Sequence, residues 1–334
     1  MLFLVAGMAF LMPGCRGGHK PVVVVYTALD RMFSEPILDE FTKRTGNKVM
    51  AKYDTEATKT VGLVNAIRSE KGRPRGDVFW NNAIVTTIRL KEDGLLAQHN
   101  SRAAAPFPAT FKDPDGYWVG FAARARVLIV NTNLVGPERM PDSIRALADP
   151  AWRGKVGIAK PLFGTTATHA ACLFAHEGDV RAREFFQSLK DNDIQIQSGN
   201  KSLALNVAAG RLAFGLTDTD DAIIEMENGQ PVTIVYPDAG SNQVGVLFIP
   251  NTLALIKGAP NAVAGRQLIE YLLSPEVEMA LAASRSAQIP LNPDVHTRLR
   301  VRTPADVKAM DVDFSKASAC FNETAEYVST TFLR

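Results

Sequence analysis

The chain has 334 residues, of which 46% are hydrophobic, and its 37 basic and 35 acidic side chains give a formal net charge of +2. This length is enough for two lobes with separate hydrophobic cores. The near balance of charge argues against a protein that binds nucleic acid through a concentrated basic surface. We therefore expect a globular protein with no nucleic-acid partner.

A short apolar run opens the chain, from Leu2 to Met12, and Gly14-Cys15 and a polar stretch follow it. This length suits the core of a secretory signal peptide rather than a membrane span. Apolar residues that end in Gly-Cys resemble the processing site of bacterial lipoproteins, in which the cysteine is lipidated. We therefore expect lipidation of Cys15 and a membrane anchor; the alternative is an apolar leader with an incidental cysteine.

From residue 22 onward, predicted strands and helices alternate. The predicted strands cover 22–26, 48–53 and 77–80, and apolar residues at helical spacing follow them at 33–41, 61–67 and 84–90. This order implies a parallel sheet with helices on both faces. Such a sheet binds ligands beyond the carboxyl ends of its strands, so the loops after Tyr26 and Trp80 are candidate ligand-binding loops.

A second α/β unit follows the first. Its predicted strands cover 127–130, 155–159, 194–197, 212–216 and 232–236, and its predicted helices begin after Gly164 and cover 202–209. After this unit come a long predicted strand run at 245–256 that Pro250 interrupts and predicted helices at 262–273 and 275–283. Extended crossings near 121–130 and 233–249 join the two units. We therefore predict two α/β lobes joined by a hinge, with a ligand cleft between them.

These elements suggest four segments. Residues 1–20 form a leader and linker, 21–123 the first part of lobe 1, and 124–236 lobe 2. Residues 237–334 return to lobe 1 and add C-terminal helices.

Three cysteines are too few for a disulfide framework. If Cys15 is lipidated, Cys172 and Cys320 remain, and they could pair in an oxidising compartment. Cys172 lies in an apolar stretch, which favours a buried free thiol instead. His169 and Cys172 have the spacing of two metal ligands on one helical turn, but no second pair accompanies them, so we do not expect a zinc site.

Common catalytic motifs are missing from the sequence. It holds no G-x-x-x-x-G-K-[ST], G-x-S-x-G or H-E-x-x-H pattern, and its five histidines form no paired catalytic constellation. We therefore predict a binding protein rather than an enzyme, with no cofactor.

Seven short segments, taken together, resemble one protein family across residues 22–295. They are VVYTA at 24–28, GDVFW at 76–80, ARARV at 123–127, GRLAFG at 210–215, YPD at 236–238, IPNT at 249–252 and YLLSPE at 271–276. This pattern resembles the periplasmic ferric-iron-binding proteins, within the extracellular solute-binding family 1 of ABC transporters.

The resemblance implies the periplasmic binding protein fold and the role of extracytoplasmic substrate-binding protein of an ABC importer. The implied partners are the importer's membrane subunits and a small-molecule or metal ligand, and the implied location is the periplasm or the cell surface. We expect a monomer. The implied cargo is ferric iron with a synergistic anion; the alternative is a phosphonate, an organophosphate or an amine in the same cleft.

Three positions depart from the iron-binding pattern. Asp30 stands near the place where iron-binding members usually carry a histidine ligand, and Asn82 stands where they usually carry a glutamate. Asp220 and Asp221 occupy the place of two adjacent tyrosines that bind iron as phenolates. These departures favour the non-iron alternative, whereas the overall resemblance favours iron.

The acidic run has two interpretations. Asp220 and Asp221 could face the cleft and bind a metal ion or an amine together with Asp30, because carboxylate oxygens are hard ligands. They could instead form an acidic cap at the start of a helix over 222–227, where aspartate complements the helix dipole. We favour the cleft.

The remaining candidates are polar groups at strand ends and helix starts. Thr165 and Thr166 open a helix and could hold an oxyanion, with Asn200 as a further donor, or could simply cap the helix. Arg124 could meet an anion at the hinge or pair with a nearby carboxylate. Tyr26 could touch ligand at the end of the first strand or be an ordinary half-buried tyrosine.

Overall fold

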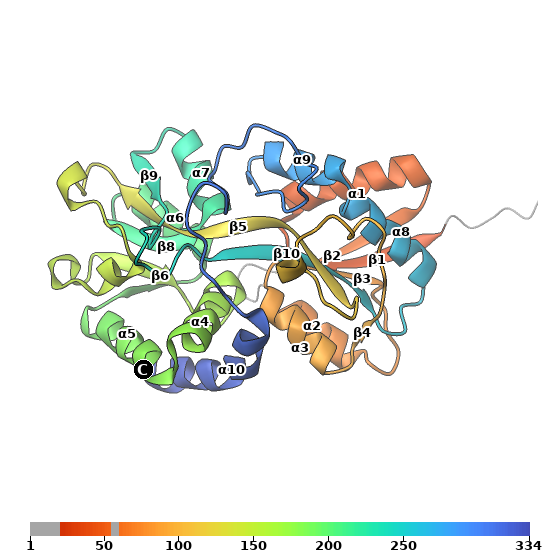
Figure 1. Cartoon of the computed structure of the whole chain (residues 1–334), viewed down its shortest axis with the longest axis horizontal. Helices are drawn as coiled ribbons and strands as arrows, with labels where there is room; N and C mark the ends of the chain where they lie inside the picture. Colours follow the sequence, from red (N-terminus) through yellow and green to blue (C-terminus); the bar gives the residue numbers. More distant parts are fainter. Residues whose placement is uncertain (1–20, 55–59) are drawn as a thin grey trace, which may run out of the picture.

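The computed structural model describes residues 21–54 and 60–334. Its helices and strands form two α/β lobes, which strand β5 (Trp118–Asn131) connects (Figure 1). The strands follow the order β2-β1-β3-β10-β5-β8-β6-β7 across both lobes. The predicted two-lobed α/β fold is therefore confirmed. The leader at 1–20, including Cys15, lies outside the described residues.

Lobe 1 contains the parallel strands predicted from the alternating pattern. Its strands are β1 (Val22–Thr27), β2 (Lys48–Tyr53), β3 (Val78–Asn81), β4 (Leu96–Ala97) and β10 (Phe248–Ile256). Its helices are α1 (Arg31–Thr45), α2 (Val61–Ser69), α3 (Ile84–Glu92), α8 (Ala262–Leu272), α9 (Pro275–Ala283) and the 3-10 helix η2 (Ala109–Phe111). Strands β2, β1 and β3 are parallel, and β10 runs antiparallel beside β3.

The two faces of the lobe 1 sheet bury different side chains. Val23 and Val25 of β1 pack with α1 and α8, whereas Tyr26 packs with the apolar residues of α2 and α3. This alternation follows from the period of two along a strand. Because both faces are covered by helices, the strands read as short apolar runs.

Lobe 2 is a second α/β unit. Its strands are β6 (Val156–Ala159), β7 (Gln195–Gln197), β8 (Phe214–Asp218) and β9 (Val232–Val235). Its helices are α4 (Gly164–Glu177), α5 (Asp179–Asp191), α6 (Asn200–Ala208), α7 (Thr219–Glu227) and the 3-10 helices η3 (Pro137–Arg139), η4 (Ile144–Ala148) and η5 (Pro150–Trp152). Helix α5 was not among the helices listed from the sequence.

Strand β5 changes partner where it passes from one lobe to the other. Ala125 is opposite Phe248 of β10, and the next residue, Arg126, is opposite Asp218 of β8. All residues of β5 are buried. The junction therefore carries two buried arginines, Arg124 and Arg126, on one face of the strand.

The predicted interruption at Pro250 is a register shift between Ile249 and Asn251, opposite β5. Proline has no N–H to donate to the ladder, so it is tolerated at a bulge. Gly120, which is opposite Thr252, lies close to this proline, and an added Cβ there would lie 3.0 Å from the Cβ of Pro250. Glycine is needed there because of this close approach.

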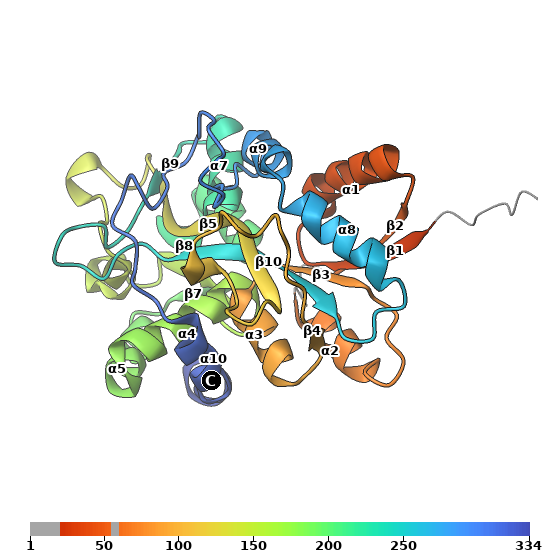
Figure 2. The same ribbon diagram turned by 45° about the vertical axis from the view of Figure 1, so that its right-hand side comes forward.

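The C-terminal helix contacts both lobes. Helix α10 (Phe314–Tyr327), followed by the π-helical turn η6 (Val328–Phe332), packs on α4 of lobe 2 and also on α3 of lobe 1, as Figure 1 and Figure 2 show along the lower side of the molecule. Cys172 of α4 and Cys320 of α10 are both free thiols. Burial raises the pKa of the Cys172 thiol.

Candidate functional site

A cavity of about 260 Å³ lies between the lobes. Its walls come from the loops after β1 and β3, from β5, and from the starts of α4, α6 and α7. The predicted site residues that line it are Asp30, Asn82, Arg124, Thr165, Thr166, Asn200, Asp220 and Asp221. The structure therefore brings together every predicted ligand-binding residue except Tyr26.

Tyr26 does not line this cavity, which favours the alternative of an ordinary structural tyrosine. Its ring is 2% exposed, and its hydroxyl donates to Glu70 Oε2 over 2.8 Å. The side chain lies on the sheet face that α2 and α3 cover. Burial, together with the nearby Glu70 carboxylate, raises the pKa of this phenol well above its usual range.

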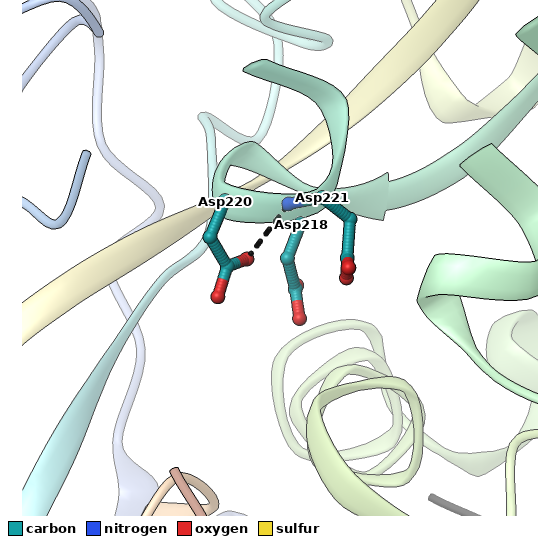
Figure 3. Close-up of side chains that lie close together, drawn as sticks. All are labelled: Asp218, Asp220 and Asp221. Carbon is teal, nitrogen blue, oxygen red and sulfur yellow. Dashed lines mark hydrogen bonds between the residues drawn. The ribbon is translucent and has the colours of Figure 1, made fainter. Parts of the chain in front are cut away.

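Three aspartates gather where β8 ends and α7 begins (Figure 3). Asp218 is the last residue of β8, and Asp220 and Asp221 lie in the first turn of α7. Their carboxylate oxygens lie within 4.8 Å of one another. Among the described residues, this is the one group of three His, Cys, Asp or Glu side chains that is close enough to hold a metal ion. The described part of the chain therefore offers no cluster around His169 and Cys172.

Asp218, which the sequence analysis did not select, is the most enclosed of the three. Its Oδ1 lies 2.6 Å from Arg126 Nη1, and its Oδ2 accepts from the Thr165 hydroxyl over 2.6 Å and from Asn200 Nδ2 over 2.8 Å. Because both oxygens already have protein donors, Asp218 holds β5, α4 and α6 together. Asp220 and Asp221 are only partly buried, so they are the carboxylates of this group that can reach a solute.

Arg124 connects three parts of the cavity wall. Its Nη1 donates to the Asn82 carbonyl and its Nη2 to Asn251 Oδ1, while its Nε lies 3.4 Å from Asp220 Oδ2. The structure thus contains the carboxylate pair that the sequence analysis considered for Arg124. The Nε is buried and makes no hydrogen bond to any described residue, although the Arg124 side chain lines the cavity.

The start of α4 presents backbone amides to the cavity. The first N–H groups of any α-helix lack an intrahelical acceptor. The residue at the N-cap position of α4 is Phe163, whose side chain cannot accept a hydrogen bond from them. The Thr165 hydroxyl donates to Asp218, and the Thr166 hydroxyl donates to Asn200 Oδ1 over 3.2 Å. The amides rather than the hydroxyls are therefore the donors that remain for an anion.

Besides Asp218, four charged residues of the cavity wall escaped the sequence analysis. Three are exposed cations, Lys160, Lys201 and Arg285, and the fourth is Glu225, which is 8% exposed. Glu225 follows Asp221 by four residues on α7. Helical spacing from the acidic run was the signal that could have identified it.

The comparisons with known proteins agree with this architecture. A family model described as bacterial extracellular solute-binding protein matches residues 86–319. Iron uptake protein A2 of Synechocystis is 27% identical over 248 residues, which cover 70% of each chain. A periplasmic protein of Salmonella paratyphi A, named for 2-aminoethylphosphonate binding, is 24% identical over 83% of this chain and 77% of its own.

Among solved structures, iron-bound HitA from Pseudomonas aeruginosa superposes with a TM-score of 0.83 at 21% identity, over 92% of this chain and 99% of HitA. This likeness supports the fold. Among the described residues, no helix is both long and apolar enough to span a membrane. The family model covers well over half of the sequence, so the chain belongs to the bacterial extracellular solute-binding proteins.

Proposed function

We propose that this extracellular solute-binding protein captures a small solute with a cationic centre in the cleft between its lobes and delivers it to the membrane subunits of an ABC importer. The observation that carries the proposal is the group of Asp218, Asp220 and Asp221 in the wall of the interlobe cavity. Ferric iron is the first candidate, because iron uptake protein A2 and the Fe(3+)-binding periplasmic protein of Serratia marcescens are relatives.

In the iron proposal, oxygen donors from both lobes hold the metal. Asp220 and Asp221 act from lobe 2, and Asp30 acts from lobe 1 with Asn82 beside it. Carboxylate oxygens suit a hard cation. A synergistic anion accepts from the first amides of α4, next to Thr165 and Thr166, while Arg124 lies between the two sites.

A second candidate is a solute that carries both an amine and a phosphonate or phosphate. The observation that favours it is the composition of the cavity wall, which contains no tyrosine among the described residues. Aspartates would bind the ammonium group, and the amides of α4 would bind the anionic group. Two relatives of this chain, each 24% identical to it, are named for 2-aminoethylphosphonate binding.

One set of measurements separates the two candidates. Protein purified from its native host is analysed for bound metal, and titration calorimetry follows with ferric nitrilotriacetate and with 2-aminoethylphosphonate. The iron proposal expects stoichiometric iron and little visible colour, because the phenolates that produce charge-transfer absorption are missing from the described wall. If neither probe binds and no metal copurifies, a cationic cargo of these classes is excluded. Recovery of a bound solute unchanged would also exclude turnover.

The proposal includes a lipid anchor at Cys15 and a monomeric protein. The apolar leader that ends in Gly14-Cys15 motivates the anchor. Lipid adds roughly 0.8 kcal/mol for each buried methylene, so several chains hold a protein firmly at a membrane. The substitution Cys15→Ser should release the protein into the soluble fraction of a native-like host. A wild-type protein that is already soluble and carries no lipid would contradict the anchor.

A further inference from the structure

One face of α7 lines the interlobe cavity. Asp221, Ile224, Glu225 and Asn228 all belong to the cavity wall, at the spacing of successive helical turns. Glu225 is the most enclosed charged group on this face, with 8% of its surface exposed. Its carboxylate does not belong to the group of Asp218, Asp220 and Asp221, so the cavity wall carries a further negative charge apart from that group.

Glu225 differs from the other buried acidic side chains of residues 21–54 and 60–334. Its carboxylate makes no hydrogen bond or ion pair with any residue in these ranges. The other five all have partners: Asp77 accepts from Val24 and Asn261, Asp113 pairs with Lys91, Asp218 with Arg126, Asp238 accepts from Ser143 and Ile144, and Glu278 accepts from Ala122, Leu291 and Asn292.

A largely enclosed carboxylate with no protein partner loses part of its hydration without gaining a compensating charge, which disfavours the solute-free protein. The five partnered acids show how this chain normally compensates for burial. No hydrogen-bond donor or cation of the described residues compensates the charge of Glu225. Its side chain lines a cavity in which a solute can supply that cation.

We propose that Glu225 is a cargo-binding residue whose carboxylate contacts a cationic group of the solute, with Asp221 one turn earlier on the same helix. This inference rests on the proposed capture of a cationic solute in the same cavity. A metal ion and an ammonium group share the required charge. The cavity of about 260 Å³ has room for more than a single ion with its direct ligands, so Glu225 extends the contact beyond the three-aspartate group.

The test compares Glu225→Gln with Glu184→Gln, a matched charge removal at an exposed position on α5 of the same lobe. In the solute-free protein, Glu225→Gln should raise the melting temperature by about 2 °C, because it removes an uncompensated buried charge. Glu184→Gln should leave the melting temperature unchanged. A lower melting temperature for Glu225→Gln would show that Glu225 supports the fold, and the inference would be overturned.

Titration calorimetry then examines ferric nitrilotriacetate, 2-aminoethylphosphonate and ethylphosphonate, which lacks the amine. For a cationic probe that binds the wild type, Glu225→Gln should weaken binding at least ~10-fold and Glu184→Gln should not. If Glu225→Gln weakens binding of 2-aminoethylphosphonate but not of ethylphosphonate, Glu225 contacts the ammonium group. If it weakens binding of ferric nitrilotriacetate, Glu225 contacts the metal. Unchanged affinity for every probe overturns the inference. If the wild type binds none of the probes, the proposed cargo fails and the binding role of Glu225 fails with it, whereas a wild type that binds a cationic probe with Glu225→Gln unchanged overturns the role of Glu225 alone.

Discussion

The carboxylate of Asp218 lies 2.6 Å from the guanidinium of Arg126, with side-chain exposures of 5% and 0%. This pair joins the hinge strand β5 to the end of β8, at the residue where β5 enters lobe 2. The Thr165 hydroxyl and the Asn200 amide complete the shell around Asp218. Protein contacts therefore hold the Asp218 carboxylate in place in the solute-free protein.

The substitution Asp218→Asn should destabilise the protein by about 3–5 kcal/mol, because it leaves the charge of Arg126 buried without a counterion. Urea denaturation of the solute-free protein measures the change. The matched control is Asp193→Asn, which breaks the Arg153–Asp193 pair. That pair is equally short, at 2.7 Å, but its side chains are 63% and 58% exposed. The control should cost less than about 1 kcal/mol. Equal losses in the two variants would contradict a structural role for Asp218.

Removing Asp220 and Asp221 together should affect binding rather than folding. The double substitution Asp220→Ala, Asp221→Ala should weaken binding of the cargo by at least roughly 2 kcal/mol, the scale of a lost charge partner. The melting temperature of the solute-free protein should fall less than in Asp218→Asn, because relief of the repulsion between clustered aspartates offsets part of the loss of the Asp220 carboxylate 3.4 Å from Arg124 Nε. Unchanged affinity with a lower melting temperature would show that these aspartates only stabilise the first turn of α7.

The elements of the fold were largely predictable because each carries its own local pattern. Strand β2 and helix α9 have the predicted bounds, and the register shift occurs at Pro250. Candidate site residues at strand ends and helix starts also lie together, because the topology of α/β sheets directs these ends to one region.

The sequence analysis misplaced or missed residues whose positions depend on the tertiary neighbours of a single side chain. Tyr26 was expected to end a strand at the edge of the cleft, but β1 continues to Thr27 and its alternation directs Tyr26 to α2, where Glu70 accepts from its hydroxyl. The sequence does not specify which member of the acidic run meets Arg126, because that depends on the register of β5 against β8. Glu225 was missed because an acidic residue inside a helix normally faces water.

His169 should make the stability of the protein sensitive to mild acid. Burial, followed by the nearby charge of Arg126, lowers its pKa to about 3. An unfolded histidine has a pKa near 6.5. Between these values the unfolded chain binds a proton that the folded chain does not, so stability falls as pH falls from about 6.5 toward 3, by up to ~1.4 kcal/mol for each pH unit. Above about 6.5 the contribution is fully present.

Urea midpoints measured between pH 4.5 and 7.5 test this sign. The acid-dependent loss should be smaller in His169→Gln than in the wild type, whereas the exposed control His296→Gln should follow the wild type. The difference between variants isolates His169 from the carboxylates that titrate in the same range. Parallel curves for His169→Gln and the wild type would contradict the assignment.

Contacts across the cleft should make closure measurable. Arg300 of the lobe 1 segment after α9 lies 2.6 Å from Glu227 of α7, and Arg285 donates to Asn228 over 2.6 Å. Small-angle scattering should therefore show a smaller radius of gyration when a probe that binds is added. The substitution Arg300→Ala removes one contact between the lobes, whose side chains are about one-third exposed. The affinity of the Arg300→Ala variant for the bound probe should fall by less than about fivefold, because partly exposed ion pairs contribute under about 1 kcal/mol. Arg153→Ala, which breaks a pair within lobe 2, should leave both measurements unchanged. A constant radius of gyration with a bound probe would exclude hinge closure.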